Sequence, residues 1–218
     1  MKRMRNPAWR TVVAAAAPLM LLVACASPAP IQLHALSAHD APPAPGAAVL
    51  TPPARGVVIE PVSVPRYADI PELVFTSQDG VSRVSESHRW RAPLSDEIAA
   101  ALSQRLQSRH GVMDVGRIAV PEGMPVMRVR LDVQRFEALP GSGEVLVSAA
   151  WSLRAAESRN AALQCAAQLR RPVTAADPDA LVRAYRAALE ALGDQIGRAL
   201  QALQAPAGAT SPVCPPAA

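Results

Sequence analysis

An alternation of apolar and polar residues in three consecutive segments constrains the fold of this chain more than any other feature. The segments span residues 127–133, 145–153 and 163–169, and their polar residues occupy mostly the even-numbered positions. Because successive side chains of a strand point to opposite faces, the pattern predicts a three-stranded antiparallel meander with one buried and one solvated face. Residues 140–143 and 157–160 are the turns expected between its strands. The apolar odd-numbered positions are Met127, Val129, Leu131, Val133, Val145, Val147, Ala149, Trp151, Leu153, Leu163, Cys165, Ala167 and Leu169.

Two other segments have apolar residues at spacings of three and four, which is typical of amphipathic helices. The first follows the helix-start residues Pro93, Ser95 and Asp96. Its apolar face consists of Leu94, Ile98, Ala101, Leu102 and Leu106, and we expect Gln104, Arg105 and Arg109 on its solvent side. The second, longer helix opens with Asp177 as N-cap and Pro178 at the first helical position. Its apolar stripe consists of Leu181, Tyr185, Ala188, Leu189, Leu192, Ile196, Ala199, Leu200 and Leu203.

Shorter strands are expected before the meander. Residues 31–36 alternate, and residues 56–65 form a β-branched run whose internal Pro61 suggests a sheet edge or a bulge. Asp79 and Gly80 predict a hairpin between residues 73–76 and 81–85. An amphipathic sheet and two amphipathic helices must bury each other, so we predict an α+β fold with two layers: an antiparallel or mixed sheet and two main helices packed on one face.

The first 24 residues have the organisation of an export signal. A positively charged start precedes an apolar stretch at residues 11–24 that is too short to span a bilayer. Leu22-Val23-Ala24-Cys25 resembles the lipobox of bacterial lipoproteins, in which the cysteine receives an S-diacylglycerol group and an N-acyl chain. The alternative is a signal peptide that happens to carry a cysteine. Because Ala26 and Ser27 follow Cys25 where inner-membrane lipoproteins usually have Asp, we expect an anchor in the outer membrane, on its periplasmic face.

The remaining organisation follows from composition. Residues 25–30 form a short tether, residues 31–204 form the domain, and residues 205–218 form a tail rich in Pro and Ala. A proline-rich loop at 40–55 interrupts the domain. Cys165 lies on the apolar face of its strand and Cys214 lies in the tail; the sequence leaves open whether they form a disulfide or whether Cys165 is a small buried hydrophobic residue.

The charge distribution argues against a nucleic-acid partner. The formal net charge is +4, with 22 basic and 18 acidic side chains. Four of the basic residues, Lys2, Arg3, Arg5 and Arg10, belong to the leader, so the rest of the chain is balanced. Polyanion binding needs a surplus of basic residues on one face, and this chain has none beyond its leader.

Motifs for catalysis and for cofactors are missing from the sequence. His34, His39, His88 and His110 are scattered, and there is no Gly-x-Ser-x-Gly, Gly-rich phosphate loop or Ser-x-x-Lys motif. Lys2 is the only lysine, which removes Schiff-base chemistry from the mature chain. We therefore expect no enzyme activity, no cofactor and no metal.

Five short motifs occur along the folded part of the chain. They are Ile59-x-Pro61-Val62-x-Val64-Pro65-x-Tyr67, Ile70-Pro71-Glu72-Leu73-Val74, Arg89-Trp90-x-x-Pro93-Leu94, Val133-x-Arg135-Phe136 and Val145-x-Val147-x-Ala149-x-Trp151-x-Leu153. Together they resemble the motifs of the ABC-type transport auxiliary lipoproteins of the PqiC type. The strongest elements are the Val-Pro-x-Tyr turn, the Trp before Pro-Leu and the inward-facing Trp of the meander. The resemblance extends from the lipobox to the last helix.

The resemblance implies a non-enzymatic periplasmic lipoprotein of the outer membrane. Such proteins work with MCE-domain proteins and inner-membrane components to move lipids between the two membranes. A homo-oligomeric ring that caps a tunnel is a further implication. The alternatives are a module that holds a phospholipid chain between sheet and helices, and an assembly lipoprotein for an outer-membrane β-barrel; an envelope hydrolase is the most distant.

The motif residues Pro65, Tyr67, Pro71 and Trp90 have two interpretations. Pro65, Tyr67 and Pro71, together with Ile70, either dock a partner or shape a corner of the fold, and the corner is favoured. Trp90 either contacts a partner or fills the space between helix and sheet, and the second role is again favoured.

Overall fold

The structure is a computed structural model that describes residues 30–37, 55–77, 79–175, 177–203, 214 and 216. The leader, Cys25, and most of the loop at 40–55 and of the tail lie outside the described residues. The predictions of a signal peptide and of lipidation therefore concern a part of the chain that is not described.

The meander predicted from the alternation is present and forms three of the five strands of the larger sheet. Its strands are β6 (Val126–Leu139), β7 (Glu144–Ala155) and β8 (Leu163–Pro172), and both pairings are antiparallel. The register of β6 against β7 shifts by one residue between Val133 and Arg135. This bulge reverses the alternation, so that Phe136, at an even position, is buried together with the odd-numbered residues before it.

The strand before Pro61 is shorter than predicted, and the segment around the proline pairs with β6 alone among the described residues, as expected for a sheet edge. β2 (Gly56–Ile59) ends before the proline and pairs in parallel with β6 on one side and with β5 (Met113–Asp114), which was not predicted, on the other. Beyond β2 the chain still follows β6, because the backbone N–H groups of Glu60 and Ser63 donate to carbonyls of that strand at 2.9 and 3.1 Å. Neither hydrogen bond involves Pro61, so its missing N–H costs nothing here.

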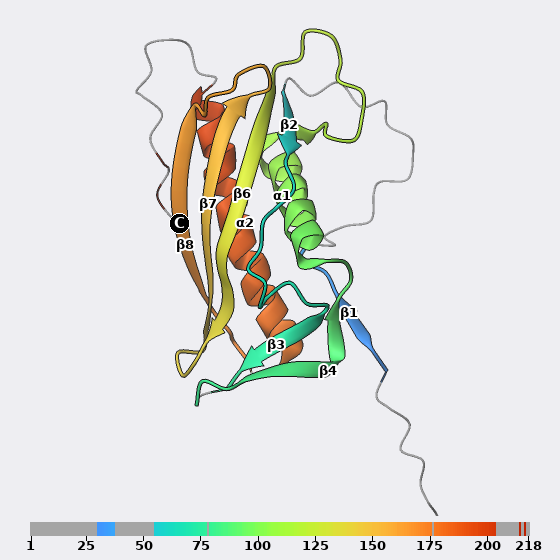
Figure 1. Cartoon of the computed structure of the whole chain (residues 1–218), viewed down its shortest axis with the longest axis vertical. Coiled ribbons are helices and arrows are strands. Elements are labelled where there is room, and N and C mark those ends of the chain that lie inside the picture. Colours follow the sequence, from blue (N-terminus) through green and yellow to red (C-terminus); the bar gives the residue numbers. More distant parts are fainter. Residues whose placement is uncertain are drawn as a thin grey trace, which may run out of the picture.

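A second sheet of three strands is present in addition to the larger sheet, whereas the sequence predicted one sheet. Its order is β1 (Gln32–His34), β4 (Ser82–Trp90) and β3 (Glu72–Thr76), with β1 parallel to β4. The hairpin between β3 and β4 is confirmed, although β4 continues to Trp90 and is therefore longer than expected. Figure 1 shows this small sheet at one end of the long axis of the molecule.

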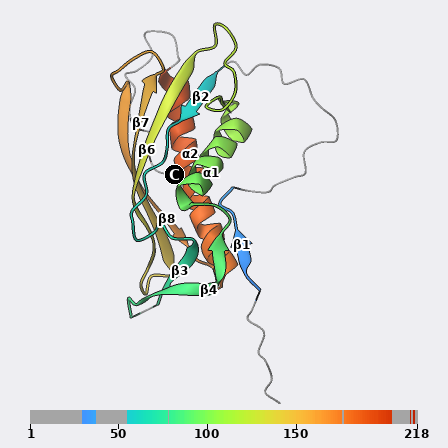
Figure 2. The same ribbon diagram turned by 45° about the vertical axis from the view of Figure 1, so that its right-hand side comes forward.

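Both predicted helices are present and lie on one face of the larger sheet, as expected for two layers (Figure 2). They are α1 (Leu94–His110) and α2 (Pro178–Leu203). The Asp177 carboxylate accepts a hydrogen bond from the N–H of Ala180 at 2.7 Å, which confirms the N-cap. α2 packs on β7 and β8, and α1 packs against α2. Among the described residues, no helix combines the length and the apolar character needed to cross a bilayer.

The contact between the two helices corrects the assignment of Arg105 to solvent. Arg105 donates to both carboxylate oxygens of Asp194 at 2.8 and 2.6 Å, and His110 Nε2 lies 3.0 Å from Asp194 Oδ1. The hydrogen bond from Arg105 holds the pKa of Asp194 below its usual value. Gly193 and Gly197 lie beneath these side chains, and a Cβ at Gly197 would overlap the imidazole ring of His110. The helices therefore depend on small residues to approach this closely.

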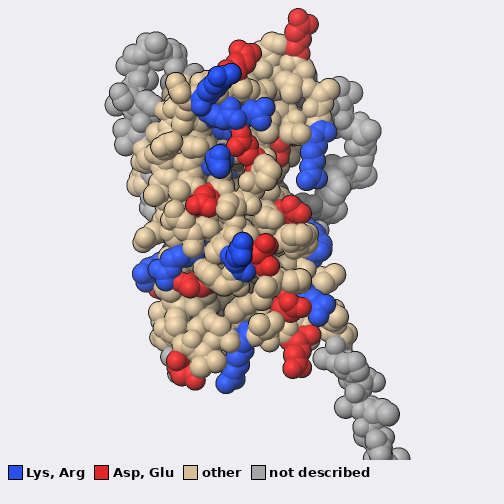
Figure 3. Space-filling view, viewed as in Figure 1, with Lys and Arg blue, Asp and Glu red and all other residues tan. Residues whose placement is uncertain are grey.

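Charges are interspersed on the face drawn in Figure 3, where arginines and acidic side chains lie among large uncharged areas. This face offers no continuous basic surface of the kind that a polyanion requires.

We expect that Gly197→Ala destabilises the protein, even though alanine stabilises the interior of a helix by about 1 kcal/mol relative to glycine. The added methyl group must displace the buried ring of His110, and overpacking of this kind typically costs about 1–3 kcal/mol. Urea denaturation measures the change. In the matched variant Gly193→Ala, the nearest atom to the added methyl group is Arg105 Cγ at 2.8 Å, farther than the His110 ring is from a methyl group at position 197, so this variant should lose less. An unchanged or raised midpoint for Gly197→Ala would contradict this account of the interface.

Candidate functional site

The motif residues Pro65 and Pro71 lie in the segment that leaves the larger sheet and enters the smaller one. The carbonyl of Pro65 accepts hydrogen bonds from the N–H groups of Ala68 and Asp69 at 2.9 and 3.1 Å, which closes a turn. The N–H of Trp90 donates to the carbonyl of Pro71 at 2.7 Å and ties the end of this segment to β4. The prolines therefore shape the corner between the two sheets.

Tyr67 lies at this corner; its hydroxyl makes a structural hydrogen bond, while much of its side chain is exposed to solvent. Its hydroxyl accepts a hydrogen bond from the N–H of Phe136 at 3.1 Å, just beyond the bulge of β6. The hydroxyl thus satisfies a backbone donor at the edge of β6, where pairing with the segment after β2 has ended. The side chain is nevertheless 52% exposed, so the ring is accessible from solvent.

Trp90 lies inside the corner and not on its surface. It is 7% exposed and meets Phe136 and Tyr185 edge to face, with ring centroids 6.1 and 6.4 Å apart. Phe136 and Tyr185 are stacked with centroids 4.0 Å apart, and burial raises the pKa of Tyr185 well above its usual value. The three rings join β4, β6 and α2, which places Trp90 in the core.

The cavity beneath the corner is small. Its volume is about 80 Å³, and its lining includes Tyr67, Glu72, Trp90, Glu137 and Tyr185. Pockets that enclose small-molecule ligands usually measure roughly 300–1,000 Å³. The cavity is therefore far smaller than a site that would hold a phospholipid chain.

The structure brings together two histidines that the sequence left scattered. β1 and β4 place His34 Nε2 2.9 Å from His88 Nδ1, and His34 Nδ1 lies 3.5 Å from a carboxylate oxygen of Asp179. Burial lowers the pKa of His34, the Asp179 carboxylate opposes the shift and His88 adds to it. Only the pairing of β1 with β4 would have revealed this contact, and no sequence motif signals it. In the described part of the chain, no group of three or more His, Cys, Asp or Glu side chains, this one included, is arranged so that it could hold a metal ion.

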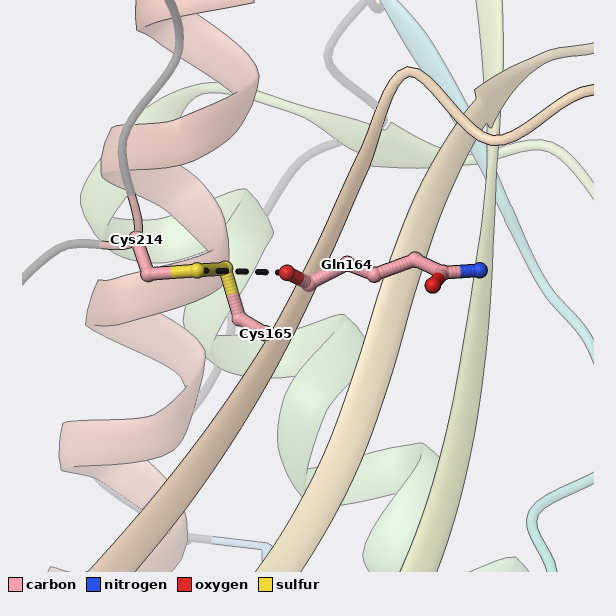
Figure 4. Close-up of a disulfide and its surroundings, with 3 residues drawn as sticks. All are labelled: Gln164, Cys165 and Cys214. Atoms are coloured by element: carbon pink, nitrogen blue, oxygen red, sulfur yellow. Dashed lines mark hydrogen bonds between the residues drawn. A yellow bond between two sulfur atoms is a disulfide. The ribbon is translucent and has the colours of Figure 1, made fainter.

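The disulfide that the sequence left open is present. Cys165 of β8 and Cys214 of the tail are bonded, with Cα atoms 5.6 Å apart (Figure 4). Cys214 Sγ lies 3.3 Å from the backbone oxygen of Gln164, and the side chain of Arg198 on α2 donates to the carbonyl of Pro216 at 3.3 Å. These contacts hold the described tail residues near edge strand β8 and the last third of α2.

Removing this disulfide should destabilise the domain. The bridge links residues 49 positions apart and encloses most of β8 and all of α2, so we expect a loss of about 2–4 kcal/mol in Cys165→Ala combined with Cys214→Ser. Thermal unfolding with and without reductant measures it. Reductant should lower the stability of the wild type and leave the double variant unchanged. Two free thiols from these cysteines in the oxidised wild type would contradict the bridge.

Tyr67→Phe isolates the structural role of the hydroxyl. The variant keeps the exposed ring but leaves the N–H of Phe136 without its acceptor, which should cost about 1 kcal/mol. Chemical denaturation checks this value. A variant as stable as the wild type would show that water replaces the hydroxyl without cost.

Solved structures with low sequence identity share this fold. An uncharacterised protein matches with a TM-score of 0.56 and 18% identity over 67% of this chain and 92% of its own. Protein XCC0632 from Xanthomonas campestris matches with a TM-score of 0.50 and 19% identity over 70% of this chain and 88% of its own. At these identities the likeness concerns the fold alone.

The family is identified by the sequence. No curated protein sequence matches the chain. One family model, described as the ABC-type transport auxiliary lipoprotein component, matches residues 35–197. The match begins just after β1 and ends within α2, so it includes the corner, the meander, α1 and most of α2. The chain therefore belongs to the ABC-type transport auxiliary lipoprotein family.

Proposed function

We propose that this protein is a non-enzymatic component of an MCE-type, ABC-associated system that moves lipids between the two membranes of the envelope. In this proposal it is anchored in the outer membrane by acylated Cys25, and its domain faces the periplasm. The observation that carries the proposal is the family match across residues 35–197, because the family is one of auxiliary lipoproteins of ABC-type transport.

The tether supports a position close to the membrane. Pro30, the first described residue, is five residues after Cys25. An extended chain spans at most about 3.5 Å per residue, so the domain begins within roughly 18 Å of its acylated cysteine. Acyl chains contribute about 0.8 kcal/mol per buried methylene, and several chains together give stable anchoring.

The disulfide supports the periplasmic location. Bonds such as Cys165–Cys214 form and persist in oxidising compartments, including the bacterial periplasm, and are rare in the cytosol. A leader with four basic residues before its apolar stretch agrees with export.

The interior favours an adaptor over a lipid carrier or an enzyme. The cavity of about 80 Å³ leaves little room for an acyl chain between sheet and helices. The shifted pKa values of Asp194 and Tyr185 follow from a helix–helix contact and from core burial, which are structural causes. Both observations agree with a protein that works through its surface.

We further propose that the corner contacts a partner through Tyr67 and Pro71, whose side chains are exposed. Pro65 closes the turn, and buried Trp90 supports it from within. Trp90 thus acts by positioning the surface and does not itself reach the partner.

Site-specific photocrosslinking in intact envelopes tests the proposal. A crosslinker at position 67 should capture an MCE-domain protein. Position 118 is the matched control, because Ile118 is 53% exposed and Tyr67 52%, and it should capture less. Crosslinks between two copies of the chain would place Tyr67 in a ring interface. Capture of an outer-membrane β-barrel instead would contradict the proposal and favour the assembly-lipoprotein alternative.

The anchor is tested separately by Cys25→Ser. The variant should remain unprocessed or become soluble, and membrane fractionation with mass spectrometry of the N-terminus measures both. An unchanged proportion of mature protein in the outer membrane would contradict lipidation at Cys25.

A further inference from the structure

An open groove lies between β1 and the first turns of α2, away from the corner. Its volume is about 470 Å³. One wall comes from residues 33–35 and the other from α2, with Arg91 at the end of β4 completing the lining. Figure 2 shows β1 beside the helices at the end of the molecule where the small sheet lies.

Three arginines line this groove and have little to neutralise them. Arg183 is exposed and makes no ion pair or hydrogen bond among the described residues. Arg186 donates through Nη2 to the carbonyl of Ala35 at 3.0 Å, whereas its Nε is buried without a hydrogen-bond partner in the described part. Arg91 Nε lies 3.3 Å from Glu97. Guanidinium groups that share a groove repel one another, so an anion between them would be stabilised.

The acidic groups nearby do not cancel this charge. Asp179 is the one acidic residue in the lining, and it lies 3.5 Å from His34 Nδ1. Glu97 is 1% exposed, accepts a hydrogen bond from the N–H of Leu36 at 2.9 Å and lies behind Arg91. The groove as a whole therefore has a positive surplus.

Apolar side chains lie next to the arginines. Leu33, which lines the groove, is 63% exposed, and Ile31 just before β1 is 55% exposed. Exposed apolar residues beside arginines are typical of surfaces that rest at a membrane interface, where guanidinium groups reach phosphates and apolar side chains enter the acyl boundary.

The position along the chain points to the same partner. Ile31 lies six positions after Cys25, which limits their distance to about 21 Å. This step rests on the proposed function, because it assumes that Cys25 is acylated. A groove held this close to a bilayer meets lipid headgroups at a high effective concentration.

We propose that this groove binds the phosphate of an anionic phospholipid headgroup. Arg183 and Arg186 donate to the phosphate oxygens, Arg91 adds positive charge, and Leu33 and Ile31 enter the interface beside it. Binding would hold the small-sheet end of the long axis against the membrane and direct the opposite end, with the start of β6, into the periplasm (Figure 1).

Vesicle binding by the unacylated chain, residues 26–218, tests the proposal. This chain keeps every described residue and lacks Cys25, so its result does not depend on acylation or on an MCE partner. We expect it to cosediment with vesicles of phosphatidylcholine mixed with phosphatidylglycerol more strongly than with phosphatidylcholine alone. Arg183→Gln should weaken the preference about fivefold, the usual contribution of one arginine at an anionic surface. Circular dichroism should show an unchanged fold, because Arg183 is exposed and makes no described contact.

Arg109→Gln is the matched control. It removes the same charge from an exposed position in the last turn of α1, outside the groove, and should change binding less than twofold. Equal losses in both variants would overturn the proposal in favour of general charge attraction. Equal binding to both kinds of vesicle would also overturn the proposal. The groove would then be a candidate binding site for an acidic segment of a protein.

Calorimetry with glycerol 3-phosphate distinguishes a lipid headgroup from a soluble phosphorylated molecule as the source of the phosphate. Weak binding of this soluble probe together with strong vesicle binding supports the headgroup. Saturable binding of the probe that Arg183→Gln abolishes, without vesicle binding, would assign the groove to a soluble phosphorylated molecule and overturn the proposal.

Discussion

The burial of α2 is the interaction on which the rest of the structure depends. Fifteen of its 26 residues are buried, and its sides face different parts of the molecule. It packs on β7 and β8, holds α1 through Asp194, supports the corner through Tyr185 and contacts the tail through Arg198. The two sheets share one hydrophobic core with this helix, because Leu73 and Trp90 of the smaller sheet are buried in the same cluster as the apolar face of the larger sheet.

Both candidate surfaces are positioned by this helix. Tyr185 stacks under the corner where Tyr67 is exposed, and Arg183 and Arg186, within one turn of it, line the groove beside β1. The two surfaces are therefore fixed relative to each other. An adaptor between a membrane and a protein partner needs this property, since a flexible joint between anchor and docking surface would not define the direction in which the body projects.

The parts of the fold that were predictable are those with local, periodic patterns. The alternation from Met127 to Leu169 and the stripe from Leu181 to Leu203 each recur often enough to define an element and its buried face. The second sheet was missed as a separate sheet because residues 86–90 of β4 carry no clear alternation, and because the residues of β1 that pair with this strand lie 56 positions before their partners in the chain. For the same reason, the His34–His88 contact and the basic groove were invisible in the sequence.

The sequence alone determined the kinds of element and the family resemblance, and it is the only basis for the predicted export signal and lipobox at Cys25, since each depends on neighbouring residues. Only the tertiary structure decided that Cys165 meets Cys214, that Arg105 faces Asp194 instead of solvent, and that Trp90 is core while Tyr67 remains exposed. The physical reason is that burial and pairing are properties of chains folded against each other. Arg105, which is expected to face solvent on an isolated helix, becomes partly buried because glycines on the neighbouring helix allow close approach.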